Sequence, residues 1–437
     1  MNVVKKDGLQ AWWATILLLA IYVFSFVDRQ ILNLLVDPIK AELALSDSQI
    51  GILQGIAFAA TYVFFSIPLG RWVDRRSRNR LITWGVAVWS LATCACGLAD
   101  NFATLFVARA LVGIGEATLT PAAWSLLSDY FSPARRALPF SIFLTGPYLG
   151  VGAAMIAGGA LVGVLPERFT WDGPIALELS RWQQIFFLVG APGLIFTVLM
   201  LATPEPPRGG GGTAGTGDAA VPYRAIIAHL AAHRAVYGAL LVGTSFLVFA
   251  LYAVQSWAPA FLHRAHGLSV TEVGVRYGTI ALVAGALGVL TSPLYGRLLR
   301  AARREHYYLL IPLGAACALV PLAVLLPLAP GVSSALALIA CISYLVTVPL
   351  APVALGLQAV TPPGMRGVVV GGYVVATNIL GLGAGPYTVG LVNDLLFADP
   401  AQIGASLGMS CAFAAAIALL LFLWGERVLR ARPPRPV

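Results

Sequence analysis

Four charged residues interrupt long apolar stretches of this chain. Asp28 and Arg29 are neighbours in the first stretch, and Arg109 and Glu116 share a later one. A charged side chain inside a segment of this apolarity costs roughly 3 kcal/mol or more, and it usually has a partner or a function. These four residues are therefore the first candidates for chemistry.

Helix geometry restricts how these charges can pair. Adjacent residues lie about 100° apart around a helix, so Asp28 and Arg29 cannot neutralise each other on one face. Arg109 and Glu116 are two turns apart and share a face. We therefore expect the carboxylates of Asp28 and Glu116 to meet Arg29 or Arg109 across two helices.

Two interpretations of the four charges remain open. A carboxyl group holds its proton more tightly when buried and less tightly beside an arginine, so a partner that moves makes proton binding depend on conformation. On this interpretation Asp28, Glu116 and Arg109 couple transport to protons. The alternative is a static ion-pair network that holds two helices together.

The same region could bind an anionic substrate. Arg29 offers several donors and does not titrate, which suits a phosphate or carboxylate. Glu116, Tyr62, Tyr148 and Asn378 complete the predicted substrate-binding set. Few other polar side chains fall within the apolar stretches, so an amphipathic anion fits better than a sugar.

Composition indicates a membrane protein. Hydrophobic residues make up 59% of the chain and charged residues 11%, whereas a soluble domain has about 25% charged residues. Apolar runs of this length can span a bilayer as helices. The twelve predicted spans are residues 12–36, 47–69, 81–99, 103–127, 138–164, 182–202, 235–262, 270–296, 305–328, 333–358, 368–396 and 402–425.

The net charge of +9 is a topology signal. Most Lys and Arg residues fall in the loops on the side of the N-terminus, which the positive-inside rule assigns to the cytoplasm. We expect an inner (plasma) membrane protein with both termini cytoplasmic and no affinity for nucleic acid. The run 12–36 is too long for a cleaved signal peptide and should be the first span.

A polar segment divides the spans into two sets of six. Residues 203–233 are rich in Pro, Gly and Ala, which indicates a flexible tether. The predicted domains are an N-terminal six-helix bundle at 1–202, a cytoplasmic linker at 203–233 and a C-terminal six-helix bundle at 234–437. Two such halves are typical of duplicated transporters.

Short loops between spans predict a conformational gate. The loop after the second span contains Gly70, Asp74, Arg75 and Arg78, and degenerate counterparts stand at the matching positions of the second half. The loop after the fourth span contains Asp129 and Arg136. Asp74 could accept hydrogen bonds from a helix N-terminus or an arginine, forming a latch that breaks on opening. Static anchoring of the loops is the alternative.

These segments resemble known transporters. The loop from Gly70 to Arg80 and the stretch from Arg109 to Ala117 resemble signatures of the major facilitator superfamily. Phe26-Val-Asp28-Arg29, Gly113-Ile-Gly115-Glu116 and the tract 378–386 are similar to the spinster family of lysolipid and sphingosine-phosphate transporters. The resemblance implies twelve helices in two bundles with pseudo-two-fold symmetry, working by alternating access on a lysophospholipid-like substrate. Gly296 replaces the acidic residue expected after the eighth span, which argues against a symmetric second latch.

Other function classes find little support in the sequence. There is no nucleotide-binding loop, metal-ligand cluster or nucleophile triad, so we expect no enzyme activity, no cofactor and no metal. The expected partners are membrane lipids, protons and the amphipathic substrate, with the chain a monomer. An exporter of hydrophobic drugs, a carrier of small organic anions, and a channel or sensor are the alternatives.

Overall fold

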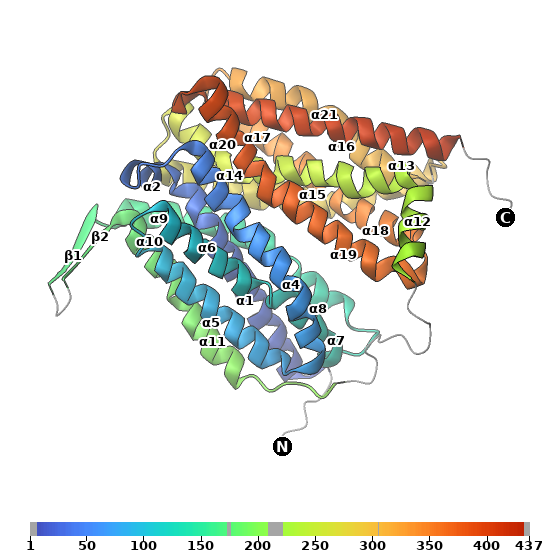
Figure 1. Cartoon of the computed structure of the whole chain (residues 1–437), viewed down its shortest axis with the longest axis horizontal. Helices are drawn as coiled ribbons and strands as arrows, with labels where there is room; N and C mark the ends of the chain where they lie inside the picture. The colour runs from blue at the N-terminus through green and yellow to red at the C-terminus, as the bar shows by residue number, and fades with distance from the viewer. Residues whose placement is uncertain (1–6, 173–175, 209–221, 305, 432–437) are drawn as a thin grey trace. The chain divides into compact units, whose positions relative to one another are not determined.

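The computed structural model describes residues 7–172, 176–208, 222–304 and 306–431 (Figure 1). The described chain is almost entirely helical and falls into two compact units. Unit 1 comprises Met1–Gly212 and Gly267–Leu282, and unit 2 comprises Thr213–His266 and Val283–Val437. Each unit is described separately below.

Unit 1 is a helical bundle with one β-hairpin. Its elements are α1 (Leu9–Leu34), α2 (Val36–Glu42), α3 (Asp47–Gly51), the π-helix η1 (Ile52–Ile56), α4 (Ala57–Arg75), α5 (Arg78–Cys96), α6 (Phe102–Glu116), α7 (Leu119–Tyr130), α8 (Ala137–Phe143), α9 (Gly146–Val164), β1 (Arg168–Asp172), β2 (Ala176–Ser180), α10 (Arg181–Gly190) and α11 (Pro192–Ala202). The two strands are antiparallel, with Arg168 opposite Ser180.

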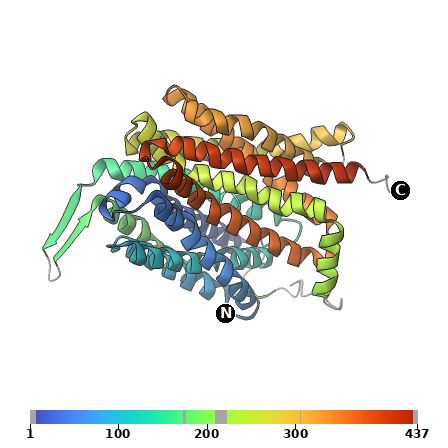
Figure 2. The ribbon, with the colours of Figure 1, turned by 45° about the horizontal axis from the view of Figure 1, so that its top comes forward.

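Unit 2 consists of helices alone within its described part. Its elements are α12 (Tyr223–Ala232), α13 (Arg234–Tyr237), the π-helix η2 (Gly238–Gly243), α14 (Thr244–His266), the larger part of α15 (Val270–Ala301), α16 (Tyr307–Leu325), η3 (Leu326–Leu328), α17 (Val332–Thr347), α18 (Leu350–Val360), η4 (Pro363–Met365), α19 (Arg366–Ala376), the π-helix η5 (Thr377–Gly383), α20 (Ala384–Val392), the π-helix η6 (Asn393–Phe397), η7 (Pro400–Gln402) and α21 (Ile403–Arg430). The long helix α21 packs against α14 and α16 (Figure 2).

Eleven described segments are long and apolar enough to cross a membrane, and they fall where spans are predicted. The remaining predicted span, 81–99, is the helix α5, which is absent from this set. Its first turn carries Arg78 and Arg80, which make it less apolar. It nevertheless packs against α6, α10 and α11 within unit 1. The predicted all-helical membrane fold is confirmed.

The segment predicted as a flexible linker contains a helix. Residues 209–221 lie outside the described part, but α12 occupies residues 223–232. Its sequence is rich in alanine, which favours helix, and Pro222 directly precedes its first turn. Residues 203–208 are bound to unit 1 through hydrogen bonds described below.

The first part of α15 belongs to unit 1 because it packs closely on α9. A Cβ atom added to Gly159 would lie 3.0 Å from the Cα of Gly274. The Thr271 hydroxyl donates to the carbonyl of Gly159 at 2.9 Å. Small residues allow such close approach between membrane helices.

Candidate functional site

The four charges come together in unit 1, on α1 and α6. Arg29 Nη2 forms a hydrogen-bonded ion pair with Glu116 Oε2, joining two helices far apart in the sequence. Arg29 is 9% exposed and Glu116 is 3% exposed. A pair this deeply buried depends on its partners, because removing one leaves an uncompensated charge.

Two aromatic rings complete the surroundings of Arg29. Its guanidinium carbon lies 4.5 Å from the ring centroid of Phe26 and 4.1 Å from that of Phe58. Cation–π contacts of this kind stabilise a buried arginine. Phe58 was not predicted as a site residue, because nothing in its local sequence distinguishes it from the other apolar residues of that span.

The guanidinium of Arg109 binds backbone carbonyls of neighbouring elements. It donates to the backbone carbonyls of Leu53, Asp28 and Arg29, each at 3.3 Å. Leu53 lies in η1, and a π-helical turn alters the regular backbone ladder and makes a carbonyl more accessible to a side chain. Arg109, which is 1% exposed, thus ties α6 to α1 and η1.

The Asp28 carboxylate is completely buried. The Thr93 hydroxyl lies beside it as a hydrogen-bond donor, and its two oxygens make no other hydrogen bond with the described residues. Thr93, Glu116 and Arg109 are among the groups that act on it. The expected contact between Asp28 and an arginine is therefore made by its backbone carbonyl and not by its carboxylate.

Glycines in α6 let this helix pack on both of its neighbours. A Cβ atom on Gly113 would lie 2.6 Å from the carbonyl oxygen of Phe58, and one on Gly115 would lie 2.7 Å from that of Gly85. Helix α6 ends at Glu116, and Pro121 follows in the first turn of α7, where its lack of an N–H interrupts the backbone ladder. This break positions Glu116 at a helix end inside the bundle.

The other predicted substrate residues lie in three elements, two of them in unit 1 and one in unit 2. Tyr62 stacks on Phe58 with ring centroids 5.4 Å apart, which brings it close to the ring that faces Arg29. Tyr148 is half-buried in α9. Asn378 belongs to η5 of unit 2, where its amide donates to the carbonyl of Val374 at 2.8 Å.

Among the predicted gate residues, Arg78 is the centre of a buried cluster. It forms ion pairs with Asp129 of α7 and with Glu205, the latter at 2.9 Å, and it is 1% exposed. Its Nη2 donates to the carbonyl of Pro206 at 2.9 Å. Arg208 donates to the carbonyls of Val73 and Arg76. The beginning of the predicted linker is thereby clamped to the ends of α4, α5 and α7.

Glu205 is a functional candidate that sequence reasoning missed. The prolines on either side of Glu205 favoured a flexible linker without bound side chains. A single acidic residue could instead have indicated an ion pair with one of the many arginines in the loop after the second span. Burial alone would raise the pKa of Glu205, but hydrogen bonds from Ser77 and Arg78 outweigh it and hold this pKa below its ordinary value. The carboxylate is therefore charged near neutral pH.

Among the other predicted gate residues, Gly70, Arg75 and Arg136 do not join this cluster. Gly70 has no atom of its own unit within 4 Å of an added Cβ, so it serves no close helix approach there. The side chain of Asp74 lies outside the described residues. Arg75 is exposed, and Arg136 Nε donates to the carbonyl of Phe131 at 3.1 Å.

The described residues contain no candidate metal centre. Within the described ranges, no three His, Cys, Asp or Glu side chains lie together as metal ligands.

Comparisons with known proteins agree with this picture. The sequence matches the Major Facilitator Superfamily over residues 18–386. It is 28% identical over 398 residues to an MFS-type efflux pump of Mycolicibacterium smegmatis, covering 89% of this chain and 86% of the relative. It is 25% identical to protein spinster homolog 3 of Danio rerio, covering 89% of this chain and 78% of the relative.

A solved structure extends the likeness to the whole fold. A bacterial homolog of the human lysosomal transporter Spinster, in an inward-facing and unoccupied conformation, superposes with a TM-score of 0.82. The two sequences are 26% identical, and the match covers 98% of this chain and all of the other. The chain therefore belongs to the Major Facilitator Superfamily of membrane transporters.

Proposed function

We propose that this transporter is a proton-coupled carrier of lysophospholipid-like or other anionic amphipathic molecules. The observation that carries the proposal is the completely buried carboxylate of Asp28 in the same bundle as the buried ion pair of Arg29 and Glu116. A charge inside a membrane-spanning helix is costly, and such a residue usually serves a function, so we assign Asp28 to the proton pathway.

Competition for Arg29 supplies a coupling mechanism. Glu116 is compensated in the bundle by the guanidinium of Arg29. An anionic head group that binds Arg29 takes over this partner, and Glu116 then takes up a proton because a buried lone charge is costly. Release of the head group reverses both steps. Substrate and proton therefore exchange in one linked equilibrium.

The surroundings of Arg29 favour an amphiphile over a hydrophilic solute. The rings of Phe26 and Phe58 flank the guanidinium, so the charge lies in an apolar environment suited to a head group attached to a chain. Spinster homologues among the relatives support the same class. The alternative is an exporter of hydrophobic drugs or a carrier of small organic anions, which the similarity to an efflux pump and to a D-galactonate transporter of Escherichia coli keeps open.

The cluster around Arg78 is the proposed gate. It holds α5, α7 and residues 205–206 together through one buried guanidinium, so the cluster must loosen when these helix ends move apart. We place this cluster in the cytoplasm together with both chain termini, since basic residues are concentrated on this side. The protein on this proposal works as a monomer in the inner membrane.

Transport into proteoliposomes tests the proposal. A fluorescent lysophospholipid should accumulate across an imposed pH gradient and stop doing so when the gradient is collapsed. Asp28→Asn and Glu116→Gln should each reduce gradient-driven uptake at least tenfold, while exchange without a gradient is less affected by Asp28→Asn. Equal gradient-driven uptake by both variants and the wild type would contradict the proposed proton coupling. Saturable uptake of galactonate or of a hydrophobic dye in place of the lysolipid would favour the alternative.

A further inference from the structure

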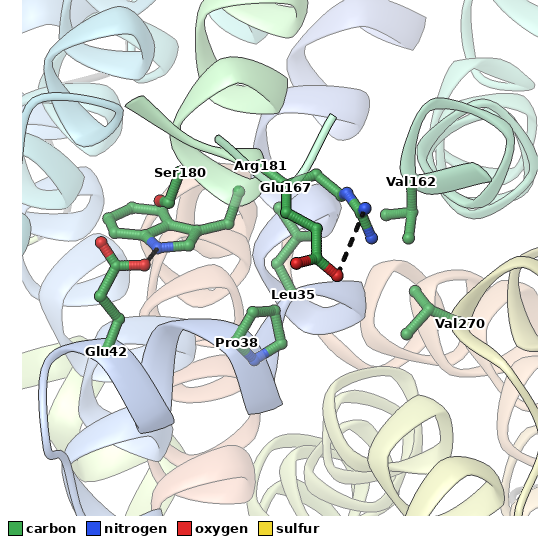
Figure 3. Close-up of a pocket in the computed structure, with 9 residues that line it drawn as sticks. Leu35, Pro38, Glu42, Val162, Glu167, Ser180, Arg181 and Val270 are labelled. Carbon is green, nitrogen blue, oxygen red and sulfur yellow. Dashed lines mark hydrogen bonds and ion pairs between the residues drawn. The ribbon is translucent and has the colours of Figure 1, made fainter. Parts of the chain in front are cut away.

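A pocket of about 290 Å³ lies in unit 1, away from the four charges (Figure 3). Its walls come from the junction of α1 and α2, from α9, from the hairpin and from the starts of α10 and α15. The lining residues are Leu35, Pro38, Glu42, Val162, Glu167, Ser180, Arg181, Trp182 and Val270. Val270 belongs to the part of α15 that is packed in unit 1.

This pocket lies at the opposite end of the bundle from the Arg78 cluster. Arg78 begins α5, and Ala99 follows the other end of that helix. The Gln183 amide at the start of α10 donates to the Ala99 carbonyl at 3.4 Å, which fixes α10 at this second end. With the Arg78 cluster placed in the cytoplasm, the pocket faces the outside.

Two donor atoms in the pocket lack a described acceptor. Arg181 Nε and Ser180 Oγ are both buried, and neither makes a hydrogen bond with any residue that the structure describes. They are adjacent in sequence, where β2 meets α10. The Arg181 N–H donates to the carbonyl of Glu167 at 2.9 Å, which fixes the backbone at this corner. Buried donors left in this way favour an oxyanion.

Two carboxylates line the same pocket. Glu42 Oε2 accepts the indole N–H of Trp182 at 2.7 Å and is held in place by it. Glu167 is only loosely paired with Arg181, at 4.0 Å, and its side chain is 89% exposed. Figure 3 shows Glu167 and Glu42 around the pocket together with Arg181. Two acids and one arginine would repel a simple anion.

A ligand that carries both signs resolves this conflict. Its oxyanion can accept from Arg181 and Ser180, and its ammonium group can pair with Glu42 and Glu167. The apolar side chains of Leu35, Pro38, Val162 and Val270 offer contact to a short carbon segment. The volume admits a head group of this size and leaves no room for a long acyl chain.

We propose that this pocket is a binding site for a zwitterion with a primary ammonium and a phosphate or carboxylate group. The site is separate from the Arg29 and Glu116 pair, and the inference does not depend on the proposed proton coupling. Such a zwitterion reaches the pocket either as a free solute or as the head group of an aminophospholipid.

Binding of phosphoethanolamine to the purified protein in neutral detergent tests the site, with isothermal titration calorimetry as the readout. Methyl phosphate and ethylamine serve as probes of one sign each. Arg181→Gln and Glu42→Gln should each weaken phosphoethanolamine binding about tenfold or more, since each removes one charged partner. The Glu42→Gln variant retains an acceptor for Trp182 and should therefore keep the fold.

Arg168→Gln is the matched control, because Arg168 lies on the same hairpin but pairs with Glu178 outside the pocket. It should bind like wild type. Methyl phosphate binding as tightly as phosphoethanolamine would overturn the proposal, and so would equal loss in the Arg168 and Arg181 variants.

A second arm distinguishes the two sources of the zwitterion. Native mass spectrometry of protein from nanodiscs containing phosphatidylethanolamine or phosphatidylglycerol counts retained lipids. If the wild type retains phosphatidylethanolamine but not phosphatidylglycerol, and Arg181→Gln retains neither, the site exists and binds a lipid head group. If only free phosphoethanolamine binds, the site exists and its ligand is a solute. No binding in either arm contradicts the proposal.

Discussion

The ion pair of Arg29 and Glu116 allows a quantitative prediction. Glu116→Gln leaves a charged guanidinium that is 9% exposed without its carboxylate. Breaking a buried pair in this way costs about 3–5 kcal/mol. The rings of Phe26 and Phe58 remain in contact with Arg29, so we expect the lower end of this range, about 3 kcal/mol.

The double variant Arg29→Gln/Glu116→Gln should recover part of this loss. Both charges are then gone, and two amides can hydrogen-bond to each other. We expect a coupling energy of about 2–3 kcal/mol between the two positions, at the upper end of the range measured for residues in contact. Equilibrium unfolding in mixed micelles measures the free energy of unfolding of each variant.

The exposed pair of Arg168 and Glu178 is the control for this cycle. Its side chains are 74% and 54% exposed, so the same amide substitutions should leave the free energy of unfolding close to that of the wild type. Additive losses at Arg29 and Glu116, or a loss below about 1 kcal/mol for Glu116→Gln, would refute the view that these two charges compensate each other in the bundle.

Three further predictions concern packing and the gate. Glu205→Gln should lower the free energy of unfolding by about 1–3 kcal/mol at neutral pH. Because the folded pKa of Glu205 lies below its ordinary value of about 4.3, its stabilisation is present above that pH and is lost as the pH falls through the folded pKa, so thermal unfolding of variant and wild type should converge in acid. Gly113→Ala should cost about 1–3 kcal/mol because its Cβ meets the backbone of Phe58, whereas Gly70→Ala should be neutral or stabilising in the same unfolding assay. Gly159→Val should slow transport and lower thermal stability by separating α9 from the start of α15; unchanged transport and stability would contradict the close contact with Gly274.

The helices and the four charges were predictable because both rest on local apolar patterning. Asp28, Arg29, Arg109 and Glu116 stand out from the sequence because charge is rare in such segments. Their pairing was not predictable, since it depends on how α1 rotates against α6. The sequence allowed either arginine as a carboxylate partner, and the structure assigns Glu116 to Arg29 and turns Arg109 to backbone carbonyls.

The parts that sequence reasoning missed depend on long-range contacts. The cluster at Glu205 forms because Arg78 donates hydrogen bonds to residues that are distant in the sequence, and no local pattern predicts such contacts. The segment 223–232 was predicted as part of a flexible linker because a Gly-rich stretch precedes it. Its own composition favours a helix, and the structure has one there. The pocket beside the hairpin requires α2, α9 and α10 to meet, which only the fold establishes.

Proton movement driven by substrate tests the central claim most directly. Proteoliposomes loaded with a pH-sensitive dye, with no imposed pH gradient, are given a lysophospholipid gradient, and the internal pH is followed. The account predicts a pH change with wild-type protein that disappears in Glu116→Gln while substrate still exchanges. Substrate flux without any pH change in the wild type, or an unchanged proton signal in Glu116→Gln, would contradict it.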